Sequence, residues 1–289
     1  MTRDAHSEAG EGGGALDEPA TEQFIGRRDL TRWSRPAQAG VALVLRIFRY
    51  ASANLVLVVT ATIGAGIAVL LTWASEEIYD SIKAANGLSS LDEPVLSRAV
   101  SSRTPQNVAV AQFITNLGGA VGLTFITVAI VIIMTVRWRS RTPLLLLAIG
   151  TAGSLLMTTV GKDLVGRARP PEIYAVPPYE TSLSFPSGHA LNNTVVACLI
   201  AYLLLLHLTS LLWRIMSVAL AVVWFITIGL TRVFLGYHWL TDVLAGWLLG
   251  LAWVSVVISC HRLYLTVRRD RPSAPSSVRM SRVHSKEAT

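Results

Sequence analysis

Six long apolar runs constrain this 289-residue sequence more than any other feature. They cover about 54–73, 118–136, 143–161, 190–212, 215–232 and 238–260. Each run approaches the ~20 residues that an α-helix needs to cross a lipid bilayer. The chain is 52% hydrophobic and only 15% charged, whereas soluble domains carry about 25% charged residues. We therefore predict an all-α fold, a six-helix transmembrane bundle.

The two ends of the chain differ from this apolar middle. Residues 1–40 contain six acidic residues before Gln23 and almost no apolar periodicity, so they cannot bury enough surface to offset the entropy lost on ordering. The other end is rich in prolines, serines and basic residues. We predict a disordered cytoplasmic tail at 1–40, a membrane domain at 41–265 and a basic, disordered cytoplasmic tail at 266–289.

The basic residues predict the orientation of the bundle, because the cytoplasmic loops of membrane proteins are rich in Lys and Arg. Six arginines and one acid lie between Arg27 and Arg49, three arginines separate the second and third runs, and seven Lys or Arg follow Cys260. These segments should be cytoplasmic. With six spans, both termini are then cytoplasmic, and the turns that follow the first, third and fifth spans are outside.

The connection at 74–117 has five acids against three bases, which favours the outer side. Val95–Val100 and Val108–Ile114 have the pattern of amphipathic helical pieces. We predict a short interfacial helix between the first and second spans.

A formal net charge of +7 does not indicate a nucleic-acid partner here. The basic residues cluster beside apolar runs and do not line amphipathic elements with exposed aromatics, as a nucleic-acid face requires. Their position favours attraction to anionic lipid. The membrane is therefore the predicted partner, and the sequence carries no prediction of oligomeric state.

Three polar stretches stand at the ends of the apolar runs, where charged groups are costly unless they are paired or functional. They are Lys162 to Pro170, Pro186-Ser187-Gly188-His189, and Arg232 to Asp242. The six-span topology puts all three on the outer face. Lysine and arginine can bind the spread negative charge of a phosphate group, and the opening turn of a helix offers free amides to an anion. One phosphate site is therefore predicted.

His238 and Asp242 are four residues apart, so on a helix they share a face and the carboxylate can hold one ring nitrogen. The other nitrogen is then free to act as a nucleophile. His189, at the start of another helix, can protonate the departing oxygen. No Asp/Glu cluster or well-placed cysteine points to a metal, so neither a metal nor a cofactor is predicted.

Together the three stretches resemble the signature of the type 2 phosphatidic acid phosphatase (PAP2) superfamily of membrane lipid phosphatases. The matching segments are Lys162-x6-Arg169-Pro170, Pro186-Ser187-Gly188-His189 and Arg232-x5-His238-x3-Asp242, within about residues 54–260. The resemblance implies a phosphohistidine mechanism with His238 as nucleophile, Asp242 as its partner and His189 as acid. It also implies that phosphate is bound by Lys162, Arg169, Ser187, Gly188 and Arg232.

Two residues in these stretches differ from the signature or fall outside it. Thr231 stands where the family usually has serine, which preserves a hydroxyl. Arg167 has no position in the signature, and we assign it an anchoring role at the lipid head groups.

The predicted function is hydrolysis of a lipid phosphate or pyrophosphate at the outer leaflet of the cell membrane. A polyprenyl pyrophosphate such as undecaprenyl pyrophosphate, phosphatidic acid and phosphatidylglycerol phosphate all fit, and the choice depends on how Pro171 to Phe185 folds over the site. Three alternatives remain. A lipid phosphotransferase would pass the phosphate to an alcohol, a transporter would more naturally carry its charges at mid-span or on broken helices, and a non-catalytic lipid-binding protein would not need both histidines.

Overall fold

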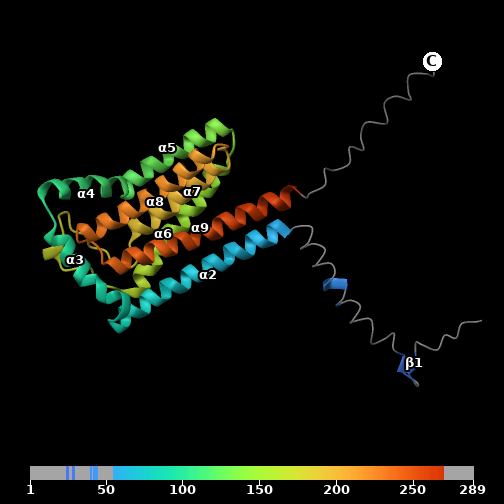
Figure 1. The fold of residues 1–289 in the computed structure, drawn as a ribbon, viewed down its shortest axis with the longest axis horizontal. Coiled ribbons are helices and arrows are strands. Elements are labelled where there is room, and N and C mark those ends of the chain that lie inside the picture. Colours follow the sequence, from blue (N-terminus) through green and yellow to red (C-terminus); the bar gives the residue numbers. More distant parts are fainter. Residues whose placement is uncertain (1–23, 26–27, 30–39, 41, 45–54, 270–289) are drawn as a thin grey trace, which may run out of the picture. The chain divides into compact units, whose positions relative to one another are not determined.

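A computed structural model describes residues 24–25, 28–29, 40, 42–44 and 55–269 of the chain. Residues 55–269 form a series of helices (Figure 1). They are α2 (Leu55–Ala84), η1 (Gly87–Leu91), α3 (Asp92–Ser101), α4 (Pro105–Leu117), α5 (Ala120–Trp138), α6 (Thr142–Val165), η2 (Glu172–Tyr174), α7 (Gly188–Leu205), α8 (Leu211–Phe234) and α9 (Leu240–Arg269).

Most of the two predicted tails lies outside the described residues. Within 1–40, the short strands β1 (Phe24–Ile25) and β2 (Arg28–Asp29) pair in antiparallel fashion. At the other end, α9 continues to Arg269 and so passes the predicted domain boundary at 265. The prediction of disorder at 270–289 falls on residues that the structure does not describe.

Six helices in the described part are long and apolar enough to cross a membrane, as predicted. These spans are Val58–Ala84, Ala120–Trp138, Thr142–Val165, Gly188–Leu205, Leu211–Phe234 and Leu240–Arg268. The first is longer than its apolar run, which ends near residue 73. The helix continues because Ile78 is buried against Phe185 and Ala245, which gives the polar last turns of α2 a packed face.

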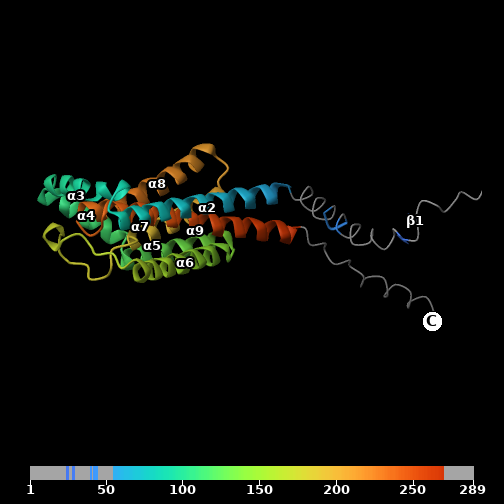
Figure 2. The same ribbon diagram turned by 90° about the horizontal axis from the view of Figure 1, so that it is seen from below.

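Two α-helices, not one, lie between the first two spans, after the short 3-10 helix η1. Both predicted amphipathic pieces form, as α3 and α4, and both pack against α8. Thr104 caps α4, because its hydroxyl accepts the Asn107 N–H at 3.3 Å while Asn107 accepts the Thr104 N–H at 2.7 Å. Figures 1 and 2 show α3 and α4 together at one end of the bundle.

The central span is α7, which packs against α6, α8 and α9. Leu191, Val195 and Leu199 recur every four residues along it and are fully buried. Helix α9 approaches α7 closely at two glycines. A Cβ at Gly246 would lie 2.9 Å from the Ser187 carbonyl oxygen, and one at Gly250 would lie 2.9 Å from the Thr194 Cβ. Small residues allow this contact, and it fixes the start of α9 beside the start of α7.

Candidate active site

The three polar stretches meet at one end of the bundle, because α6 and α8 end where α7 and α9 begin. Lys162 lies in the last turn of α6, and Arg232 in the last turn of α8. Ser187 is the N-cap of α7, and Asp242 lies in the first turn of α9. The Ser187 N–H donates to the Asp242 carbonyl at 3.1 Å, which joins the starts of the last two helices.

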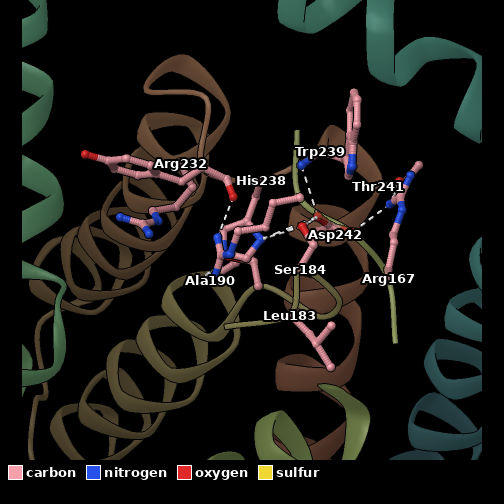
Figure 3. A network of polar contacts seen from close by, with 12 residues as sticks. Arg167, Leu183, Ser184, Ala190, Arg232, His238, Trp239, Thr241 and Asp242 are labelled. Carbon is pink, nitrogen blue, oxygen red and sulfur yellow. Dashed lines mark hydrogen bonds and ion pairs between the residues drawn. The ribbon is translucent and has the colours of Figure 1, made fainter. Parts of the chain in front are cut away.

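Asp242 is the centre of a buried network (Figure 3). Its Oδ2 lies 3.4 Å from His238 Nδ1, accepts the Trp239 N–H at 3.0 Å and accepts the Ser184 hydroxyl. Its Oδ1 accepts Arg167 Nη1 at 2.6 Å. The side chains of His238 and Asp242 are only 2% and 0% exposed. Both carboxylate oxygens are therefore held, and the carboxylate in turn fixes the imidazole.

The other nitrogen of His238, Nε2, lies 3.2 Å from Arg169 Nη1. A guanidinium can only donate hydrogen bonds, so Nε2 must accept, and the ring proton belongs on Nδ1, facing Asp242. Burial lowers the pKa of His238 to about 4, although the hydrogen bond and the charge of Asp242 act in the opposite direction. At neutral pH the ring is uncharged, with a lone pair on Nε2.

Arg169 belongs to a group of three cations, in which Lys162 interacts electrostatically with Arg169 and Arg232. Each of the three is held by hydrogen bonds to neighbouring segments. Lys162 Nζ donates to Ser182 Oγ at 3.1 Å and to the Leu183 carbonyl. Arg169 Nη2 donates to the same hydroxyl at 3.0 Å. Arg232 is buried and donates to Thr115 Oγ1 at 3.2 Å. The cations are thus close together and fixed before any substrate binds.

Glu180 lies among these cations. Its Oε1 pairs with Arg232 Nη2 at 2.5 Å, and its Oε2 lies 3.7 Å from Arg169 Nη2. Burial acts to raise the pKa of this carboxyl, but the charges of the two arginines and the Arg232 hydrogen bond outweigh burial and lower it. Glu180 is therefore an anion at neutral pH, and it is the carboxylate that pairs with Arg232 and lies near Arg169.

The start of α7 adds hydrogen-bond donors and the second histidine. Ser187 is buried, and its hydroxyl accepts the Ala190 N–H at 3.5 Å. A Cβ at Gly188 would lie 3.0 Å from the Thr158 methyl group, so a larger residue would push against α6. The first amides of a helix have no acceptor within the helix. His189 follows Gly188, and its electrostatic interactions extend to Arg232, His238, Arg169 and Lys162.

The assignment of Arg167 to a membrane anchor is wrong. Its guanidinium bridges two buried carboxylates, Asp92 at 2.7 Å and Asp242 at 2.6 Å, and donates to Thr241 Oγ1 at 2.8 Å. The reason is the turn that ends α6. Gly166 has φ +65°, a conformation that glycine adopts without strain, and the chain then directs Arg167 toward the start of α9.

Several other residues of the network were not predicted from the sequence. Ser184, Glu180, Asp92 and Thr241 contact the dyad or its arginines, and Asp92 Oδ1 also accepts the Thr241 N–H at 2.9 Å. Asp92 and Arg167 are 75 residues apart, so no local pattern joins them. The one signal in the sequence was Arg167 itself, a second arginine two positions before Arg169. By contrast, the hydroxyl of Thr231 donates to Ile228 O in its own helix.

In the part of the chain from 55 to 269, no group of three or more His, Cys, Asp or Glu side chains is placed to hold a metal ion. The residues around the dyad are mainly cations and hydrogen-bond donors, and the two acids among them, Glu180 and Asp92, are each paired with an arginine. They suit an anion with several oxygens.

A histidine–aspartate pair among fixed cations, at one end of a six-span bundle, defines a multi-pass membrane protein of the phosphatase class. Residues 143–264 match the PAP2 superfamily. The chain is 38% identical over 171 residues to phosphatidylglycerophosphatase B of Bacillus subtilis (strain 168), a match that covers 57% of this chain and 81% of the relative. The chain belongs to the PAP2 superfamily, and it is a membrane phosphatase.

Two further comparisons agree with this membership. An undecaprenyl-diphosphatase of Sulfolobus acidocaldarius is 30% identical over 138 residues, which is 46% of this chain and 62% of the relative. The crystal structure of a transmembrane PAP2 type phosphatidylglycerolphosphate phosphatase from Bacillus subtilis superimposes with a TM-score of 0.63 at 33% identity. That superposition covers 71% of this chain and 98% of the neighbour.

Proposed function

We propose that this protein hydrolyses a lipid phosphate through a covalent phosphohistidine on His238. The observation that carries the proposal is the orientation of the ring. Nδ1 faces the buried Asp242, and Nε2 faces Arg169 within the group of cations. A neutral imidazole held in this way is an activated nucleophile.

In the first step, His238 Nε2 attacks the phosphorus, and the bond from phosphorus to the lipid oxygen breaks. His189 donates a proton to that oxygen, so the lipid leaves as an alcohol or, from a pyrophosphate, as a monophosphate. Lys162, Arg169 and Arg232 bind the phosphoryl oxygens together with the Ser187 hydroxyl and the Gly188 amide. Arg169 exchanges its contact with Nε2 for a contact with the phosphate.

In the second step, His189 takes a proton from water, and the water oxygen attacks the phosphohistidine. The bond between phosphorus and Nε2 breaks, inorganic phosphate leaves, and His238 returns to its neutral form. Asp242 stabilises the positive charge that the ring carries while it is phosphorylated. Each step uses only side chains and amides of the site, so we propose that no metal or other cofactor takes part.

Glu180 has to leave the arginines when the phosphate enters. Its side chain is 34% exposed, so it has solvent to move into. A phosphate monoester carries about 1.5 to 2 negative charges near neutral pH and can replace the single charge of the carboxylate on both arginines.

The relatives guide the choice of lipid. A phosphatidylglycerophosphatase gives the longer match, and the solved neighbour has the same activity in its description. Phosphatidylglycerol phosphate is therefore the first substrate to test, followed by undecaprenyl pyrophosphate and phosphatidic acid. A phosphotransferase would share the first step and differ only in using an alcohol in place of water.

We further propose that the site faces the extracytoplasmic side, with both termini in the cytoplasm and the membrane domain at 41–265 flanked by two tails. The arginines of the turns between spans support this orientation. Tyr179 lies on the segment over the site and is 52% exposed. Tyr179→Cys should react with an impermeant thiol reagent in intact cells. If this cysteine reacts only after the cells are lysed, the site faces the cytoplasm and the proposed orientation is wrong.

The direct test of activity is phosphate release from a panel of lipid phosphates in detergent, with chelator present. The wild type should release phosphate from at least one lipid, and His238→Ala should be inactive. An inactive wild type on every lipid, or a loss of turnover with chelator, would contradict the proposal. Addition of an alcohol acceptor separates hydrolysis from phosphotransfer, because a transferase would form a new phosphate ester.

A further inference from the structure

A groove of about 740 Å³ lies at the end of the bundle opposite the candidate active site. It is formed by the turn after α5, the first half of α6 and the second half of α9. Lys162 lies near the end of α6 and Arg141 immediately before its start. At ~1.5 Å per helical residue, the end of the groove at Arg141 is about 30 Å from Lys162, and the part at Ile149 is about 20 Å from it.

The walls of the groove are apolar and open to the lipid side of the bundle. Leu145, Ile149, Val256 and Leu265 line it and are all substantially exposed. The indole of Trp253 also lines it and is held in place, because Nε1 donates to the Gly150 carbonyl at 3.0 Å. A volume of this size is within the ~300–1,000 Å³ of small-molecule sites. Apolar walls of this kind suit a hydrocarbon chain.

The rim of the groove is cationic. Arg139, Arg141 and Arg268 line it together with Tyr264, and no aspartate or glutamate does. Among the described residues none of these arginines has an ion-pair partner. All three are exposed, so their guanidinium groups are open to an anion from outside the described chain. Basic pockets between membrane helices bind anionic head groups in this way.

The combination of apolar walls and unpaired arginines favours one kind of ligand over others. A soluble anion would leave the walls unused, and a zwitterionic lipid would bring its own cation toward the arginines. An anionic glycerophospholipid uses both parts of the groove. Arginine can also bind two phosphate oxygens at once, which favours a phosphodiester head group.

We propose that this groove binds an anionic phospholipid, with its phosphate on Arg139, Arg141 and Arg268 and an acyl chain along Ile149, Trp253 and Val256. The site is separate from the candidate active site and does not depend on the reaction proposed there. It makes the end of the bundle remote from the chemistry sensitive to the charge of the surrounding lipid.

The test is native mass spectrometry of the purified full chain in detergent with phosphatidylglycerol or with phosphatidylcholine of the same acyl chains. The triple variant R139Q/R141Q/R268Q should lose at least about tenfold in affinity for phosphatidylglycerol, since each arginine near a membrane surface contributes to binding of anionic lipid. The matched control is R137Q/R214Q/R262Q, which removes the same charge from residues that do not line the groove. This control variant should bind phosphatidylglycerol as tightly as the wild type does. Any phosphatidylglycerol held at the active site contributes equally in both triple variants, so it does not affect their comparison.

An equal loss of phosphatidylglycerol affinity in the two triple variants would mean that the lipid is attracted to the basic surface in general. Equal binding of phosphatidylglycerol and phosphatidylcholine by the wild type would mean that the groove does not select an anionic head group. Either result overturns the proposal. Ile149→Trp provides a second variant that leaves every charge in place. It fills the groove, so it should also weaken phosphatidylglycerol binding, and wild-type affinity in this variant would contradict the placement of the acyl chain.

Discussion

Arg167 Nη1 lies 2.6 Å from Asp242 Oδ1, and the same guanidinium reaches Asp92 through Nη2 at 2.7 Å. One arginine therefore ties the carboxylate behind the proposed nucleophile to α3, a helix of the connection between the first two spans. With Oδ1 taken by Arg167, Oδ2 is directed to Ser184 and His238. Helix α3 is in this way part of the framework of the site.

Arg167→Gln should lower kcat by roughly 10- to 100-fold with a smaller change in KM, because small displacements of a catalytic group are costly while the phosphate contacts remain. Arg167→Lys should recover part of the loss, since it keeps the charge. The measurement is steady-state hydrolysis of a lipid phosphate. Arg98→Gln is the control, because Arg98 is exposed on α3. Wild-type kinetics in Arg167→Gln would show that Arg167 does not position the catalytic residues.

Asp92 and Glu93 provide a matched pair of variants that tests whether the link to α3 affects the reaction. Asp92 is buried and holds Arg167 and Thr241, whereas Glu93 is exposed. Asp92→Asn should reduce kcat in the same direction as Arg167→Gln, and Glu93→Gln should not. Equal kinetics in the two variants would mean that the link to α3 has no influence on the reaction.

The charge state of His238 can be measured directly. Burial lowers its pKa to about 4, so the ring should stay neutral as the pH falls through 6.5, the ordinary value for histidine, and gain its proton only near pH 4. Nitrogen NMR of labelled histidine, with the signal assigned by His238→Gln, should show the Nδ1–H tautomer at pH 6. A ring that is half protonated at pH 6.5 would contradict the account.

Glu180 should compete with phosphate for Arg169 and Arg232. Glu180→Gln removes the competing charge, so inorganic phosphate should inhibit this variant at several-fold lower concentration than the wild type. Glu172→Gln is the matched control, because Glu172 is exposed on the same segment. Weaker inhibition by phosphate in Glu180→Gln would mean that the carboxylate organises the arginines and does not block them.

The effect of replacing His189 should depend on how readily the leaving group departs without a proton. His189→Gln should lower hydrolysis of a lipid phosphate by about 10²–10⁴-fold, the usual contribution of a general acid. Formation of the phosphoenzyme from p-nitrophenyl phosphate should suffer far less, because nitrophenolate leaves without a proton. A single-turnover burst of nitrophenol measures this step, and equal losses on both substrates would assign His189 to binding.

The sequence predicted the six spans and the meeting of the three stretches because both follow from strong constraints. A span needs a long apolar run. No span separates the first two stretches, and two spans separate the second from the third, so all three lie at one end of the bundle. Lys162, Arg169, Arg232, His189, His238 and Asp242 were chosen because ionisable groups are expensive near a membrane and because these six fall on positions of the PAP2 signature. Their roles stay predictions.

The rest depended on tertiary contacts that no local pattern carries. Arg167 looked like an anchor because its partner Asp92 is far away in the sequence, and Glu180 lies in a segment without periodicity. The last turns of α2 are polar, so the end of the first span was placed too early. Packing against Phe185 extends that helix.

A histidine nucleophile can be tested by trapping the covalent intermediate. The protein is mixed briefly with a lipid phosphate carrying radioactive phosphorus, quenched in alkali, which preserves phosphohistidine, and mapped by mass spectrometry. We expect one phosphoryl group on Nε2 of His238, absent from His238→Ala and longer-lived in His189→Gln. Hydrolysis without any labelled protein, or a label on another residue, would contradict it.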